Sequence, residues 1–107
     1  LYASHRVVGS DDLLFVVDRT TGALLPAQFN AGSDDYLEID GLCDVDSDID
    51  AIAFDPVNEL LYGSNGEELV EIDLVTGDCD DIGDFGGGGP AITITGLGFD
   101  ANGDLFG

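Results

Sequence analysis

Two phrases of sequence each occur twice, in the same order, within the 107 residues of this chain. Residues 15–22 read FVVDRTTG, and residues 70–77 read VEIDLVTG, with the aspartate, threonine and glycine in register. Residues 52–63 read IAFDPVNELLYG, and residues 97–107 read LGFDANGDLFG, with a turn that is one residue shorter. Self-similarity of this kind indicates one supersecondary unit that stacks against copies of itself. The sequence therefore predicts a single repeat region over residues 1–107.

Both phrases have the pattern of antiparallel β-structure. In the second phrase, apolar residues flank short turns at residues 56–58 and 101–103, and Pro, Asn and Gly in such turns are typical of hairpins. In residues 69–74, Val70, Ile72 and Leu74 alternate with Leu69, Glu71 and Asp73. This is the period of two expected for a strand with one solvent-facing side. Residues 13–17 are apolar throughout, which predicts a strand buried on both faces. The fold class is therefore predicted to be all-β.

A four-stranded antiparallel meander accounts for the order of the phrases. A hairpin leads to a strand, a Thr-Gly turn follows, and a fourth strand is expected near residues 24–29 in the first unit and 79–85 in the second. The recurring Asp18 and Asp73 are expected to order the Thr-Gly turns. The expected units are residues 1–48, with an insertion near residues 30–41, residues 49–90, and a partial third unit at residues 91–107.

These phrases resemble the repeats of secreted β-propellers, the broad group with YVTN-like and NHL-like blades. The resemblance covers nearly the whole chain, and it implies propeller-blade-like units in an extracellular or cell-surface protein. A closed propeller has about four to eight blades, whereas this chain supplies about two units. The units are therefore expected to be open or completed by neighbouring copies, or the chain is a fragment of a longer propeller.

Free strand edges favour head-to-tail association of copies of the chain. The chain begins and ends at the same phase of the repeat, which makes Leu1 and Tyr2 at one end and Leu105 and Phe106 at the other the expected assembly edges. Such contacts form a ring if the rotation closes and a filament if it does not. We expect a self-assembling structural protein. The alternative is a binding module whose inserted loop, residues 30–41, recognises a ligand or a surface.

The net charge of −21, from 23 acidic and two basic residues, excludes several classes of function. Nucleic acid and anionic lipid would be repelled along most of the surface, so divalent cations are the expected small partners. No apolar run approaches the roughly 20 residues of a membrane-spanning helix, and we expect no membrane insertion. The single histidine, His5, has no cysteine near it in sequence, and no serine lies in a nucleophile motif, so we expect no enzyme activity.

An acidic run precedes the second unit. Asp44, Asp46, Asp48 and Asp50 occupy alternate positions, and alternate residues of an extended chain share a face. Calcium takes six to eight oxygen ligands, so these four carboxylates are a candidate calcium site. A solvated acidic loop without a bound ion is the alternative.

The two cysteines, Cys43 and Cys79, are a candidate disulfide. A pair of cysteines in a small domain from an oxidising compartment usually forms a bridge. Two cysteines cannot complete a tetrahedral zinc site on their own. Pairing between molecules and two free thiols remain the alternatives.

Overall fold

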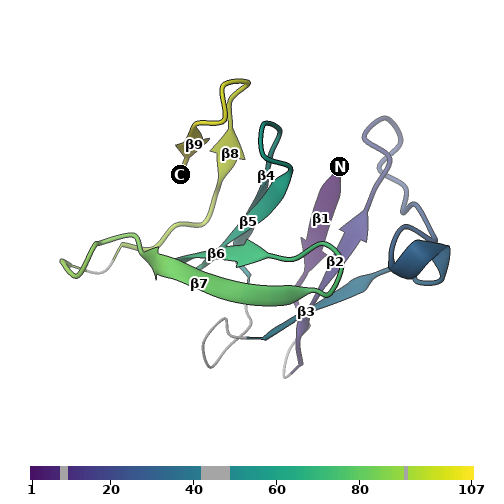
Figure 1. The fold of residues 1–107 in the computed structure, drawn as a ribbon, viewed down its shortest axis with the longest axis horizontal. Coiled ribbons are helices and arrows are strands. Elements are labelled where there is room, and N and C mark those ends of the chain that lie inside the picture. The colour runs from purple at the N-terminus through teal and green to yellow at the C-terminus, as the bar shows by residue number, and fades with distance from the viewer. Residues whose placement is uncertain (8–9, 42–48, 91) are drawn as a thin grey trace.

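The computed structural model describes residues 1–7, 10–41, 49–90 and 92–107 (Figure 1). Within them the protein is all-β, as the sequence predicts. The strands are β1 (Tyr2–His5), β2 (Asp12–Val16), β3 (Leu37–Gly41), β4 (Ala51–Asp55), β5 (Leu60–Asn65), β6 (Glu68–Ile72), β7 (Asp78–Asp84), β8 (Gly98–Phe99) and β9 (Leu105–Phe106), and a 3-10 turn, η1 (Asn30–Gly32), lies between β2 and β3.

Seven strands form one sheet in the order β1-β2-β3-β7-β6-β5-β4, and β8 and β9 form a separate hairpin. Neighbouring strands of the sheet are antiparallel except β3 and β7, which are parallel at Asp40↔Asp78 and Gly41↔Cys79. The sheet bends so far that its edge strands β1 and β4 contact each other. The sheet is therefore nearly closed, and Figure 1 shows the β8–β9 hairpin standing beside β4.

The second unit is the predicted antiparallel meander, because β4, β5, β6 and β7 pair in chain order. Both predicted hairpins are confirmed as well. In each turn an aspartate carboxylate accepts backbone N–H groups: Asp55 Oδ1 accepts that of Val57 at 2.8 Å, and Asp100 Oδ1 accepts that of Asn102 at 2.9 Å. These bonds replace the ladder bonds that a reversing chain loses.

The two Thr-Gly turns have the same hydrogen bonds. Asp18 Oδ1 accepts the backbone N–H groups of the second and third residues that follow it, at 2.7 and 3.1 Å. Asp73 Oδ1 does the same at 2.7 and 3.0 Å. Hydrogen bonds from the backbone of Thr20 and Thr76, respectively, are the largest cause holding the pKa of these carboxyls below the ordinary value. The predicted role of the two aspartates in ordering the turns is confirmed.

The hairpin of β1 and β2 has the same register as the hairpin of β5 and β6. Residues 1–5 of the first unit correspond to residues 61–65 of the second, and residues 12–18 correspond to residues 67–73. The pairs Tyr2↔Val16, Ala3↔Phe15, Ser4↔Leu14 and His5↔Leu13 recur as Tyr62↔Glu71, Gly63↔Val70, Ser64↔Leu69 and Asn65↔Glu68. The repeat read from the sequence is therefore also a repeat of strand pairing.

The fourth strand of the first unit differs from the prediction of one strand over residues 24–29. It begins as predicted, because Leu24 pairs with Val17 in an isolated bridge. It stops at Pro26, which has no N–H to donate to a ladder, and Ala27 follows with a φ of 58°. The same strand position beside β2 is then resumed by β3. Five of the twelve residues of the expected insertion, residues 37–41, therefore form a strand rather than a loop.

The inserted segment itself covers residues 27–36 and leaves the sheet at a defined point. In the second unit, a β-bulge lies at the corresponding position, between the pairs Val70↔Asp81 and Leu69↔Gly83. A bulge already adds a residue without disturbing the pairing on either side. The first unit thus carries a longer excursion where the second carries a bulge.

The core lies between the strands of the two units. Its fully or almost fully buried side chains are Leu14, Phe29, Ile39, Ile49, Leu61, Val70, Ile72 and Cys79. The expectation that residues 13–17 are buried on both faces is wrong for this structure, because Leu14 is fully buried whereas Leu13, Phe15 and Val17 are half-buried. One face of β2 packs on the second unit and the other does not.

Candidate functional site

The aromatic contact between the first and second units recurs between the second unit and the partial third unit. The ring of Tyr2 contacts that of Phe54, with centroids 5.7 Å apart. The ring of Tyr62 contacts that of Phe99, with centroids 5.5 Å apart. Because Tyr62 and Phe99 are the repeat counterparts of Tyr2 and Phe54, consecutive units meet in the same way at both junctions.

A backbone tether also recurs at the two junctions. The N–H of Ile49, which leads into β4, donates to Oδ2 of the completely buried Asp12 at 2.8 Å. The N–H of its counterpart Ile94 donates to the carbonyl oxygen of Gly66 at 2.8 Å. The carbonyl of Ile94 in turn accepts a hydrogen bond from the hydroxyl of the buried Ser64. The chain entering each following unit is thus hydrogen-bonded to the hairpin of the preceding unit.

The residues expected at the assembly edges lie at sheet margins. Leu1 and Tyr2 belong to the β1 end of the seven-stranded sheet, and Leu1 is 71% exposed. Leu105 and Phe106 form β9, and Phe106 is 61% exposed. In β9 they correspond to Leu1 and Tyr2, since Phe99 pairs with Leu105 as Phe54 pairs with Leu61. β9 is therefore the repeat counterpart of β1, and it pairs with β8 as β5 pairs with β4.

An apolar groove of about 560 Å³ runs beside β1. Its walls come from β1, β4, β5 and β8, and its lining residues are Leu1, Tyr2, Ile52, Ala53, Phe54, Leu61, Leu97, Gly98 and Phe99. In the second unit, β5 is paired on this side by β4. The groove therefore lies where the first unit would place the counterpart of β4.

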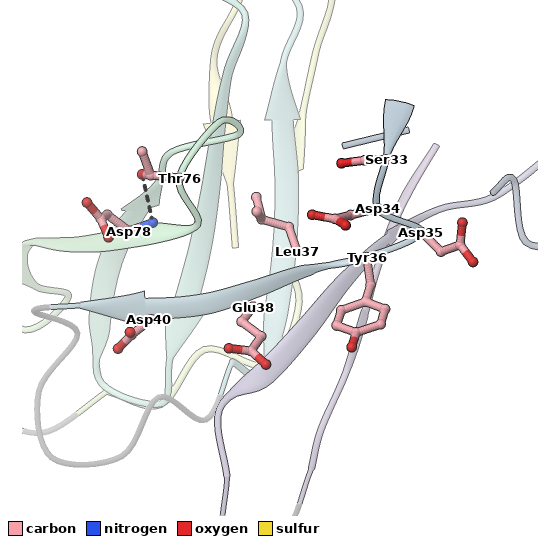
Figure 2. A pocket seen from close by; sticks show the side chains of 9 residues that line it. All are labelled: Ser33, Asp34, Asp35, Tyr36, Leu37, Glu38, Asp40, Thr76 and Asp78. Carbon is pink, nitrogen blue, oxygen red and sulfur yellow. Dashed lines mark hydrogen bonds between the residues drawn. The ribbon is translucent and has the colours of Figure 1, made fainter. Parts of the chain in front are cut away.

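A second, acidic pocket of about 550 Å³ lies at the inserted segment (Figure 2). It is lined by Ser33, Asp34, Asp35, Tyr36, Leu37, Glu38, Asp40, Thr76 and Asp78. The parallel pairing of β3 with β7 brings residues 76–78 beside residues 38–40 of β3. Figure 2 shows Tyr36, Glu38 and Asp40 on one side of β3 and Leu37 on the other. The pocket is therefore a product of the insertion and of the contact between units.

Two carboxylates of this pocket support the inserted segment. Asp35 Oδ1 accepts the N–H of Ala27 at 2.8 Å, and Asp34 Oδ2 accepts a hydrogen bond from Asn30 Nδ2 at 3.2 Å. Over residues 1–7, 10–41, 49–90 and 92–107, the structure forms no group of three or more His, Cys, Asp or Glu side chains suited to holding a metal ion. The acidic pocket is thus a negatively charged hollow rather than an assembled cation cage.

The predicted calcium site falls largely outside the described residues. Asp44, Asp46 and Asp48 lie there, and only Asp50 is described. Asp50 Oδ1 lies 2.6 Å from Arg6 Nη2 in an ion pair that joins the first and second units. Calcium binding by this run stays a prediction.

The candidate disulfide is described at one of its two positions. Cys79 in β7 is completely buried, and Cys43 lies outside the described residues. Gly41, two residues before Cys43, pairs with Cys79 across the parallel contact of β3 and β7. The chain therefore passes close to Cys79 just before it reaches Cys43, and the bridge stays a prediction.

The sequence interpretation missed the unit junctions and the buried carboxylate of Asp12. A signal for the second was present, because Asp12 directly precedes the apolar strand residues 13–17 and the strand period places it on the face of Leu14. No family model, curated protein or solved structure matches the chain. In the described part of the chain, no helix has the length and hydrophobicity needed to cross a membrane.

Proposed function

We propose that the chain is an extracellular, self-assembling structural protein whose copies join head to tail by pairing of edge strands, without catalytic activity. Strand β8 of one copy pairs with β1 of the next, as β4 pairs with β5 inside the chain. The observation that carries this proposal is the equivalence of β9 and β1, which makes β1 of another copy a correct partner for β8.

The internal pairing of β4 with β5 supplies the register of this contact. Five residue pairs join β4 to β5, whereas two join β8 to β9. By repeat correspondence, the contact between copies places Phe99 opposite Leu1, Gly98 opposite Tyr2 and Leu97 opposite Ala3. A neighbouring β1 therefore offers β8 a longer ladder than β9 does, and displacing β9 breaks only two pairs.

The backbone of β1 is oriented for this addition. Val17 N–H donates to the Leu1 carbonyl at 2.8 Å, so Leu1 and every second residue after it bond to β2. In an antiparallel ladder the residues in between, Tyr2 and Ser4, direct their N–H groups to the opposite side of the strand. The apolar groove on that side would be covered by the added strand, which supports the proposal through burial of apolar surface.

Light scattering of the purified chain during size-exclusion chromatography tests the proposal. The mass is expected to rise above 11.1 kDa with concentration. Replacing Ser4 with proline removes one outward N–H and leaves the ladder to β2 intact, so association should weaken by about tenfold or more. Ser4→Thr keeps the N–H and serves as the matched control. A monomer at every concentration would refute the proposed function.

Binding of a ligand by the inserted segment is the second candidate function. The acidic pocket favours it, because residues of that segment and of β3 supply most of its lining. Such a ligand would be cationic, with divalent ions or a polyamine as the simplest classes. Titration calorimetry with spermidine tests this function: a Glu38→Gln, Asp40→Asn double variant should bind spermidine more weakly than the wild type.

A further inference from the structure

On the side of the first unit that faces away from the second unit, β1 and β2 present mostly apolar residues, and Glu38 of β3 lies beside Leu13. Leu14 points into the core, so its neighbours Leu13 and Phe15 project to the opposite face of the sheet. Cross-strand pairing adds residues of β1 to the same face, and the bridge from Val17 adds Leu24. The outer face of the first unit, as we define it, comprises Leu1, Ala3, His5, Leu13, Phe15, Val17 and Leu24.

The corresponding face of the second unit is buried within the chain. Leu61 is 1% exposed and Cys79 is 0% exposed, because both pack against the first unit. Their counterparts in the outer face, Leu1 and Leu24, are 71% and 47% exposed. Apolar residues at these two register positions are thus covered by a neighbouring unit in one case and exposed in the other.

The described residues cover this face only in part. Phe15 contacts His5 and Tyr36, with ring centroids 6.4 and 6.2 Å apart. These three rings form a row, yet His5 and Tyr36 are themselves exposed. An apolar sheet face with aromatic side chains at its centre is a typical protein interface.

From this repetition we infer that the outer face of the first unit docks on the second unit of another copy, and that the interface between copies repeats the interface between units inside the chain. The inference rests on the proposed function and names its surfaces. When β8 of one copy takes up β1 of the next, β8 and strands β1 to β3 complete a four-stranded unit. That unit stands where the internal repeat places a third unit, against the second.

The second unit presents the matching surface. Its side facing β8 carries Tyr62, Leu69 and Phe85, all half-buried in the single chain. They correspond to Tyr2, Leu14 and Ile39 of the first unit, which pack in or against the core between the two units. Three apolar residues that receive the second unit inside the chain thus have half-buried apolar counterparts available to receive another copy.

One pair of positions changes from apolar to charged between the two interfaces. Val16 and Leu74 both pack against the core at the junction within the chain. Their counterparts at the junction between copies are Glu71 of one copy and Arg19 of the next. The repeat thus assigns opposite charges to two positions that both pack against the core inside the chain, although only two residues of the chain are basic. This complementarity favours a second copy over an unrelated apolar partner.

Substitution at Leu24 tests the docking. Leu24→Asp places a charge on the outer face at an already exposed side chain, whereas Val75→Asp makes the same change at a side chain that is 81% exposed and lies in the second Thr-Gly turn. In sedimentation equilibrium at high salt, Leu24→Asp should weaken association by about tenfold or more and Val75→Asp should leave it unchanged. Unchanged melting of both variants would establish that they fold.

Charge reversal provides a second measurement on residues that do not support the core. Arg19→Glu should weaken association, and Arg19→Glu combined with Glu71→Arg, which restores the net charge, should recover it. Association that persists in Leu24→Asp but fails in Ser4→Pro would overturn the docking face and leave edge pairing standing. A double charge variant as weak as Arg19→Glu would also overturn it. A wild-type chain that never associates would refute both proposals.

Discussion

The carboxylate of Asp12 accepts the backbone N–H of Ile49 at 2.8 Å, although the two residues lie 37 positions apart. Its other oxygen accepts the N–H of Val7 at 3.0 Å, and the side chain is completely buried. One aspartate thus satisfies two backbone donors and fixes the start of the second unit on the first.

Replacement of Asp12 should be strongly destabilising. Asp12→Ala leaves two backbone N–H groups without their acceptor, and we expect the free energy of unfolding to fall by about 3 kcal/mol. Asp12→Asn keeps one acceptor oxygen and should cost about half as much. Urea unfolding followed by circular dichroism measures both, with Asp80→Ala in the exposed part of β7 as the control for removing a charge. Equal stability of Asp12→Ala and the control would contradict the assigned role.

The glycines of the two Thr-Gly turns should respond differently to alanine. Gly22 and Gly77 both have positive φ, 74° and 79°, which costs a residue with a Cβ about 1 kcal/mol. A Cβ on Gly22 meets no atom within 4 Å, whereas one on Gly77 would overlap the carbonyl oxygen of Glu38. Thermal unfolding should therefore show Gly22→Ala about 1 kcal/mol and Gly77→Ala at least about 3 kcal/mol less stable than wild type. Similar losses in the two variants would show that β3 does not press on the second turn.

The Asp73 turn should make stability depend on pH below 3.8. Hydrogen bonds from Thr76 and Val75 lower the pKa of Asp73 from 3.8 in the folded chain. Because the folded pKa is depressed, the stabilisation is fully present above the unfolded value and is lost as the pH falls through the folded value. The stability difference between wild type and Asp73→Asn should therefore be constant near neutral pH and shrink below pH 3.8. Asp80→Asn is the charge control, and a difference that grows on acidification would disprove the assignment.

Reduction should destabilise the chain if Cys43 and Cys79 form a bridge. In the chain-entropy model, a loop of this length contributes about 3–4 kcal/mol, so the melting temperature should drop when a reductant is added. Alkylation of the unfolded, unreduced chain should label neither cysteine, and a non-reducing gel should show no covalent dimer. Labelled thiols would establish free cysteines, and a covalent dimer would establish pairing between molecules.

Calcium should stabilise the chain more than salt does if the acidic run binds an ion. An affinity of about 10⁻⁴–10⁻³ M is typical of extracellular calcium sites, so millimolar calcium should raise the melting temperature and EGTA should reverse the rise. Sodium chloride at equal ionic strength controls for screening of the net charge of −21. An Asp46→Asn, Asp48→Asn variant should lose the response. Equal effects of calcium and sodium would mean that the run is a solvated acidic coat.

Local chemistry explains why some elements could be predicted from the sequence. The hairpins at 56–58 and 101–103 and the turns after Asp18 and Asp73 depend on residues within a few positions of one another, and the structure forms them as expected. The edge position of β1 followed from repeat phase alone. These features require no knowledge of distant partners.

The features that could not be predicted depend on pairing between residues far apart in the sequence. The resumption of the fourth strand as β3 depends on its partner β2 and on the interruption at Pro26, so the sequence alone predicts a loop at residues 37–41. The acidic pocket exists because Asp40 pairs with Asp78, and no local pattern indicates a parallel contact between the two units. The burial of Asp12 likewise depends on a donor from the next unit.

The 27–36 excursion lies at the repeat position where the second unit has its β-bulge. This position determines how the length of the excursion can vary. Residues added or removed there leave the ladder intact on both sides, since Leu24 keeps Val17 and Leu37 keeps Leu14. The length and sequence of the excursion can therefore diverge from unit to unit while the sheets stay paired, as long as an apolar side chain takes the core position of Phe29. A foreign peptide grafted into the exposed turn at residues 30–33 would therefore be displayed on the surface without disturbing the strand pairing on either side.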